Sequence, residues 1–348
     1  MTESKLNPTL KKGFLARLAS MDANILRLSV MFIAVFALMS ILRPTIFLRP
    51  HNLVSMLKQF PEYGIMAIGI SLAMITGGID LAVVGTANLA AIITAKFLIA
   101  SVPKGSPTGY TLVMILIGIV IAVATGAACG ALSGLLISRF RIPPILATLG
   151  TFQLYTGFAI VITAGRPISG LPILFSRIGN KTLLGVLPVP FLIYVLAALA
   201  IGIMLAKTRF GKQVYLIGTN PTAAKFAGLN VHAILMRTYI TSGVLASFSG
   251  LIMMARVNSA KADYGASYTL QCVLIAVLGG VNPDGGFGSV GGVTLAVLIL
   301  QILSSGLNMF ENVSNFYRDV IWGGVLILVL VMNFAVTEMK RRKALKNA

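Results

Sequence analysis

Long apolar stretches recur along the whole chain and constrain its fold more than any other feature. The run 111–137, for example, contains no charged residue. A helix needs roughly 20 mainly apolar residues to cross a bilayer, and in lipid only helices or closed barrels satisfy every backbone polar group. We therefore expect an all-α fold, a polytopic membrane helix bundle of about ten transmembrane segments. The expected spans are residues 25–42, 55–76, 81–100, 111–137, 145–164, 189–206, 234–255, 270–281, 293–309 and 320–336.

Charged residues are too few for a water-soluble protein. They make up 11% of the 348 residues, against 57% apolar residues, whereas a soluble domain carries about 25%. The 28 Lys and Arg outnumber the 9 Asp and Glu, and they lie almost wholly at the two ends and between the apolar runs. Such charge is typical of cytoplasmic loops that contact anionic lipid headgroups. We expect membrane lipids, and no nucleic acid, as the partners of this charge.

The basic segments predict on which side of the membrane each loop lies. An even number of spans places both termini on one side, and because both are basic, that side is cytoplasmic. The basic loops 139–141 and 207–232 then also fall inside. The loop 165–188 falls outside although it too contains basic residues, which runs against the rule. The expected organisation is a basic cytoplasmic N-terminal segment (1–24), one transmembrane domain (25–337) and a basic cytoplasmic tail (338–348).

The polar segment 207–232 is too poor in apolar residues to cross the membrane, and it contains the signals of a short helix. Asn220 is a favourable N-cap, and Pro221 then occupies the first helical position. Gly228 can end the helix in a left-handed conformation. We predict a helix of about two turns on the cytoplasmic face, a suitable place for another protein to push. The alternative is a plain capped loop.

One acidic residue lies between two apolar runs, directly after a break in the helical pattern. In the sequence Thr76-Gly77-Gly78-Ile79-Asp80, two glycines interrupt the helix and a carboxylate follows. Ionisable groups at membrane depth are costly and usually face a bundle interior or a water-filled path. We predict that Thr76, Gly77, Gly78 and Asp80 belong to a translocation pathway or its gate. The alternative is a tight surface turn with a solvated Asp80.

A second glycine-rich segment, residues 279–288, resembles a phosphate-binding loop at first sight. It lacks the Lys-Ser/Thr of a Walker A motif, so we expect a turn and not a nucleotide site. The two cysteines, Cys129 and Cys272, lie inside apolar runs without metal-ligand spacing. No catalytic constellation is evident, and an enzyme, a cofactor and a metal are not expected.

Polar side chains in the later spans are candidates for contact with a solute. We select Asn258, Gln271 and Asn308 for the translocation pathway, because neutral hydrogen-bonding groups suit a sugar. Polar residues in spans more often hold helices together, and for each residue taken singly this remains the stronger alternative.

Several motifs in a fixed order resemble those of a known transporter family. The chain is similar to the permease subunits of bacterial ribose-type sugar ABC importers, a family that also includes autoinducer-2 permeases. The resemblance extends over nearly the whole chain. The motifs that carry it are residues 76–81, 144–151, 207–211, 218–228, 277–280, 285–288 and 305–308.

The resemblance implies a mechanism and a set of partners. Two permease subunits, either two copies of this chain or this chain and a paralogue, would form the path in the bacterial inner membrane. Two cytoplasmic ATPase subunits would use the ATP, and a periplasmic binding protein would deliver the solute. The family's coupling helix, which docks on the ATPase, corresponds to Asn220, Pro221, Ala223, Ala224, Lys225 and Gly228.

Other transporter classes fit less well. An ion-coupled secondary transporter often has internal repeats and several acidic residues within its spans, and neither is evident here. A permease for branched-chain amino acids or nucleosides, from neighbouring importer families, stays open as an alternative.

Ala82 and Val84 replace the Ser and Gly that many relatives carry after the aspartate, which indicates an unusual solute or a different permease partner.

Overall fold

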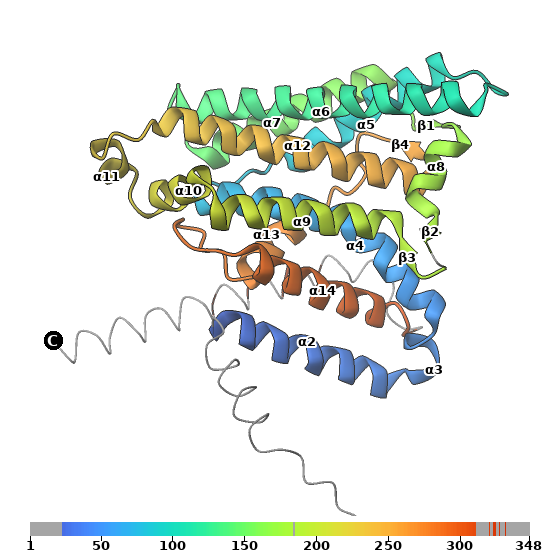
Figure 1. Cartoon of the computed structure of the whole chain (residues 1–348), viewed down its shortest axis with the longest axis horizontal. Helices are drawn as coiled ribbons and strands as arrows, with labels where there is room; N and C mark the ends of the chain where they lie inside the picture. Colours follow the sequence, from blue (N-terminus) through green and yellow to red (C-terminus); the bar gives the residue numbers. More distant parts are fainter. Residues whose placement is uncertain are drawn as a thin grey trace, which may run out of the picture.

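The computed structural model describes residues 23–183 and 185–310, together with residues 320, 323, 324, 327 and 331. Long helices lie side by side along one common axis, and most connections between them lie at the two ends of this bundle (Figure 1). The helices are α2 (Ala23–Leu42), α3 (Pro44–Phe47), α4 (Pro50–Ile75), α5 (Val83–Ser101), α6 (Thr108–Ser138), α7 (Pro144–Thr163), α8 (Ile173–Asn180), α9 (Val189–Lys207), α10 (Arg209–Thr219), α11 (Pro221–Phe226), α12 (Val231–Val257), α13 (Tyr268–Leu278) and α14 (Val290–Leu307).

The expected all-α membrane architecture is confirmed, whereas the number of spans is not. Nine of the ten predicted runs coincide with helices of the structure. Seven of the described helices, namely α2, α5, α6, α7, α9, α12 and α14, are long and apolar enough to cross a membrane. Helix α4 has 26 residues but includes two charged ones, Lys58 and Glu62. The tenth run, 320–336, lies mostly outside the described residues, as do segments 1–22 and 338–348.

Helix α13 has 11 residues, about half the number needed to cross a bilayer. The run 270–281 is therefore too short to be a full span, whereas the predicted turn after it is confirmed. Gly280 has a φ of 86° directly after the helix, a conformation that glycine adopts without steric cost. The amide of Asn24 donates a hydrogen bond of 3.0 Å to the Gly279 carbonyl, which fastens this turn to the start of α2.

Helices α6 and α12 cross in close contact because glycines face one another. A Cβ at Gly243 would overlap the carbonyl oxygen of Gly126, and a Cβ at Gly130 would overlap the carbonyl oxygen of Tyr239. Small residues allow such backbone approach between membrane helices. Most of α4, from Phe60 to its end, is buried against α12, α9, α13 and α14 and forms the centre of the bundle.

The connections gather at two ends, which we call the α11 end and the α8 end. The loop before Pro144 and the segment 208–230 lie at the α11 end, and the loop 164–188 lies at the α8 end (Figure 1). The predicted separation of these loops is confirmed. The α8 end also holds two antiparallel pairs of two-residue strands, β1 (Ile168–Ser169) with β4 (Ser259–Ala260) and β2 (Thr182–Leu183) with β3 (Leu187–Pro188).

Candidate functional site

The predicted short helix exists as α11 and has both of its predicted caps. The Asn220 side chain accepts a hydrogen bond of 2.9 Å from the Ala223 N–H, and Pro221 occupies the first turn. At the other end Gly228 has a φ of 80°. The N–H of Leu229 donates to the Ala224 carbonyl at 3.1 Å, the 6→1 bond of a Schellman motif. Local sequence thus makes this helix stiff.

Helix α11 and its caps expose all but one of the six residues predicted for docking, with Asn220 among the exposed ones. Pro221, Ala223, Lys225 and Gly228 are exposed. Ala224, however, is only 7% exposed and packs against the hydrophobic core. Its selection as an accessible docking residue is corrected for this reason, because its side chain anchors α11 to the bundle.

Phe226, which was not among the predicted docking residues, has a side chain that is 89% exposed. An exposed aromatic residue on a stiff helix is typical of a binding hot spot. The available signal was its position, because Phe226 shares a helix face with the polar Thr222 four residues earlier.

Directly before α11 the chain crosses two other backbones, at what we call the glycine junction: Ile75, Gly77, Gly218, Gly285 and Gly286. The Gly286 N–H donates a hydrogen bond of 2.9 Å to the Ile75 carbonyl. A Cβ at Gly218 would overlap that carbonyl oxygen and the Gly286 nitrogen. The end of α4, the end of α10 and the loop 279–289 therefore meet with no side chain between them.

A side chain of α10 fastens the same loop. The Tyr215 hydroxyl donates a hydrogen bond of 2.7 Å to the Gly288 carbonyl. Burial raises the pKa of Tyr215 above its usual value near 10, so the hydroxyl keeps its proton and remains a donor. The glycine-rich segment 279–288 is thus a turn held against α10, in agreement with the prediction.

The glycine break after α4 positions the carboxylate of Asp80 inside the bundle. Asp80 is 3% exposed. One of its oxygens accepts a hydrogen bond of 2.7 Å from the Ser242 hydroxyl of α12, and the other accepts one of 3.1 Å from the Ala82 N–H at the start of α5. The alternative of a solvated surface aspartate is therefore excluded. Both oxygens bond to protein donors, which favours a structural or gating role over direct contact with a solute.

Residues of α7 and α12 enclose the same break. A Cβ at Gly78 would approach the Cβ of Pro144 to 2.9 Å and would crowd the Tyr239 hydroxyl. The Thr148 hydroxyl donates a hydrogen bond of 3.0 Å to the Ile79 carbonyl. Thr76, Gly77, Gly78 and Asp80 thus lie together, as predicted, at a point where four helices meet.

The other predicted pathway residues lie apart from Asp80. Gln271 is buried on α13, and Asn308 is exposed after the end of α14. Asn258 ends α12 at the α8 end with a φ of 54°. It lines a cavity of about 690 Å³ together with Lys104 and Arg177. The structure therefore does not bring the seven predicted residues into one site.

A buried ion pair that was not predicted joins α4 to α12. The Glu62 carboxylate of α4 is fully buried and accepts two hydrogen bonds from the Arg256 guanidinium of α12. The distance from Arg256 Nη2 to Glu62 Oε2 is 3.1 Å. Arg256 lies in the last turn of α12, so the pair joins α4 to the end of α12 and helps to hold these two helices together. Within the described ranges, no cluster of three or more potential metal ligands occurs.

The comparisons with known proteins agree with this architecture. The family model described as the permease component of a branched-chain amino acid transport system matches residues 52–330. The chain belongs to this permease family. The match includes the glycine junction and all of α11.

Individual relatives of the permease are similar over most of their length. The ribose import permease protein of Bacillus subtilis (strain 168) is 36% identical, over 87% of this chain and 91% of the relative. An autoinducer 2 import system permease protein of Yersinia enterocolitica is 32% identical, over 79% of this chain and 81% of the relative. A protein of the same name from Escherichia coli is 30% identical over similar shares, 79% and 81%. No solved structure matches the chain at a significant level.

Proposed function

We propose that this permease is the membrane-spanning subunit of an ABC importer that passes a sugar or a sugar-like solute across the bacterial inner membrane. The named relatives import ribose and autoinducer 2, and the family description mentions branched-chain amino acids. The ribose permease is similar over nine tenths of its own length, which favours a sugar-type solute over an amino acid.

The observation that carries the docking proposal is the exposed Phe226 on α11. Helix α11 has caps at both ends, is anchored by the buried Ala224 and projects from the bundle (Figure 1). In this proposal the ATPase binds Phe226 together with its exposed neighbours Pro221, Ala223 and Lys225. ATP is bound and hydrolysed by that separate subunit.

The glycine junction would transmit the movement of α11 into the spans. Gly218 lies two residues before Asn220 and touches both the end of α4 and the loop 279–289. A displacement of α11 therefore acts directly on the segment that leads to Asp80 and on the loop between α13 and α14. We infer that these elements rearrange when the path changes between inward and outward access.

In this mechanism Asp80 links the start of α5 to α12. Its hydrogen bonds to Ala82 and Ser242 keep the start of α5 aligned with α12 while the glycine break moves. Removal of either bond would loosen that alignment without removing a contact to the solute.

The α8 end would receive the periplasmic binding protein, and the α11 end would face the cytoplasm together with both termini. The basic residues on the segment 207–232 support this orientation. A second permease, either another copy or a paralogue, would complete the path.

Reconstitution into vesicles tests the proposal. The permease should take up solute only with its ATPase, its binding protein and ATP, and a binding assay on the cognate binding protein with ribose, other sugars, autoinducer 2 and leucine should identify the solute. Uptake driven by an ion gradient without the ATPase would indicate a secondary transporter instead. Binding of leucine alone would indicate the amino acid branch of the family.

A further inference from the structure

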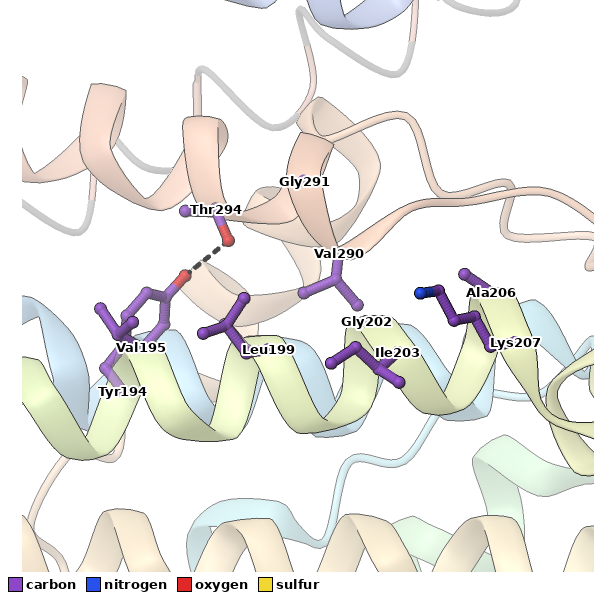
Figure 2. A pocket seen from close by; sticks show the side chains of 11 residues that line it. Tyr194, Val195, Leu199, Gly202, Ile203, Ala206, Lys207, Val290, Gly291 and Thr294 are labelled. Carbon is purple, nitrogen blue, oxygen red and sulfur yellow. Dashed lines mark hydrogen bonds between the residues drawn. The ribbon is translucent and has the colours of Figure 1, made fainter.

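A groove of about 450 Å³ runs along the outside of the bundle between α9 and α14. Figure 2 shows its walls, with Val195, Leu199 and Ile203 along α9 and Val290 and Thr294 on α14. From Tyr194 to Lys207 the lining covers 13 helical steps, about 20 Å at 1.5 Å per residue. This length is about two thirds of a hydrocarbon core of about 30 Å, enough for the acyl chain of one leaflet together with the start of its headgroup.

Glycines keep the groove open. Gly291 on α14 is exposed, and a Cβ built there would have no atom within 4 Å. A Cβ at Gly202 on α9 would meet only the Val290 side chain, at 3.9 Å. The two helices thus leave room between them for a slender molecule, and neither glycine is required by close backbone packing.

The chemistry of the lining is apolar along its length and basic at one end. The Tyr194 hydroxyl donates a hydrogen bond of 3.0 Å to the Thr294 hydroxyl, and these two side chains close one end of the groove. At the other end the Lys207 amino group turns back toward Val290 (Figure 2). In the described part of the chain the ion pairs join Arg256 to Glu62 and Lys261 to Asp263, so Lys207 has no carboxylate partner there.

We propose that this groove binds one anionic phospholipid, with an acyl chain along α9 and the phosphate at Lys207. The groove opens on the outer surface of spans whose neighbouring residues, such as Leu196, are exposed and apolar. A sugar would find no free hydroxyl or amide partner along its length. Lys207 lies at the end of α9, where a lysine reaches the headgroup region, and its positive charge complements a phosphate but not a neutral headgroup.

The position of the groove gives the lipid a route to influence transport. Helix α9 continues through Thr208 into α10, and α14 begins directly after the loop 279–289. A bound lipid therefore lies between two helices whose connections meet at the glycine junction. Loss of the bound lipid should change ATP-driven uptake through the packing of these helices. Binding of the ATPase to Phe226 should stay unchanged.

Native mass spectrometry of the full-length permease in detergent tests the proposal, with phosphatidylglycerol and phosphatidylcholine of equal acyl length as probes. The wild type should retain one phosphatidylglycerol in preference to phosphatidylcholine. Lys207→Gln should lower this preference about fivefold, the factor that corresponds to roughly 1 kcal/mol for one lysine near an anionic headgroup. Gly291→Leu should fill the groove and remove the retained lipid of either kind.

Two variants serve as matched controls. Lys212 is an exposed lysine of α10 outside the groove, and Gly150 is an exposed helical glycine of α7 whose built Cβ has no atom within 4 Å. Lys212→Gln and Gly150→Leu should both retain the lipid like the wild type. Equal losses in Lys207→Gln and Lys212→Gln, or full retention in Gly291→Leu, would overturn the proposal.

A cysteine at the groove distinguishes other occupants. The two native cysteines are buried, so Leu199→Cys provides the one exposed thiol among the described residues. This variant should form no disulfide-linked dimer on oxidation in membranes. Disulfide-linked dimers would assign the groove to a second copy of the permease, and that result would contradict a lipid site.

Discussion

The backbone of Gly218 in α10 lies directly against the carbonyl group of Ile75 at the end of α4. The same carbonyl accepts a hydrogen bond of 2.9 Å from Gly286. Three segments that are far apart in the sequence therefore share one contact point, two residues before the cap of α11. This arrangement links the proposed docking helix to the spans without a long relay of side chains.

Gly218→Ala is expected to disrupt the glycine junction. The added Cβ overlaps backbone atoms of Ile75 and Gly286, which cannot move aside like a side chain, so the folded state should lose about 2 kcal/mol or more. Thermal unfolding in detergent and ATP-driven uptake should both decline. Gly157→Ala is the control, because a Cβ there has no neighbour within 4 Å; an equal loss in the control would show that the effect is not specific to the junction.

Phe226→Ala is expected to weaken binding of the ATPase. Truncation of an aromatic hot spot costs about 2 kcal/mol, roughly a 30-fold higher Kd, and the exposed side chain contributes little to folding. The permease should therefore keep its unfolding temperature while co-purification with the ATPase falls. Lys212→Ala, at an exposed position of α10 outside α11, is the control and should leave co-purification unchanged.

Ala224→Arg distinguishes anchoring from docking. Because Ala224 is buried against the core, an arginine there should displace α11 and lower thermal stability as well as ATPase binding. A variant with unchanged stability and lost binding would instead place Ala224 in the docking surface, against the structure.

Variants of the Asp80–Ser242 pair should separate charge from hydrogen bonding. Asp80→Ala leaves the Ala82 N–H and the Ser242 hydroxyl without their buried acceptor and should cost about 2 kcal/mol. Asp80→Asn keeps an acceptor oxygen for Ala82 and should retain most of the stability. A double-mutant cycle with Ser242→Ala, followed by thermal unfolding, measures the coupling between the two residues.

Additive effects of Asp80→Ala and Ser242→Ala would show that the two side chains are not coupled. Normal uptake by Asp80→Asn would show that transport does not need the negative charge.

The Glu62–Arg256 pair should respond asymmetrically to the loss of each partner. Arg256→Met leaves a fully buried carboxylate alone and should cost about 3 kcal/mol. Glu62→Gln should cost less, because the Arg256 side chain is 29% exposed and can turn toward solvent. The double variant should recover part of the loss.

Unfolding of the three variants in detergent provides the measurement. Lys261→Met, which breaks the exposed pair with Asp263, is the control and should leave the unfolding temperature unchanged. Equal losses from both single variants would contradict the asymmetry.

Local patterns in the sequence were sufficient for the long helices and for α11, whereas α3, α8 and α10 were not predicted. Apolar runs of about 20 residues predict spans because lipid permits few other solutions. The caps of α11 were also evident, since Asn220, Pro221 and Gly228 act on backbone groups within a few residues of themselves. The tenth span falls on residues that are mostly outside the described ranges, and it stays a prediction.

Contacts between segments that are distant in the chain could not be predicted from local sequence patterns. Nothing near Asp80 in the chain indicates Ser242, and nothing near Gly218 indicates Ile75 or Gly286. The pairing of Glu62 with Arg256 likewise depends on how α4 packs against α12. Apolar periodicity does not specify which helices become neighbours in a bundle whose surfaces are apolar all round.

By itself the sequence determined that the protein is a multi-pass membrane helix bundle with a stiff, capped helix outside the spans, because these properties depend on composition and on local hydrogen bonding. Only the tertiary structure decided which side chains are available to a partner and which are enclosed. In the folded chain Ala224 is buried and Phe226 is exposed. Asp80 is hydrogen-bonded to α12, and a groove lies beside Lys207. Exposure results from the packing of segments that lie far apart in the chain, and no local pattern contains that information.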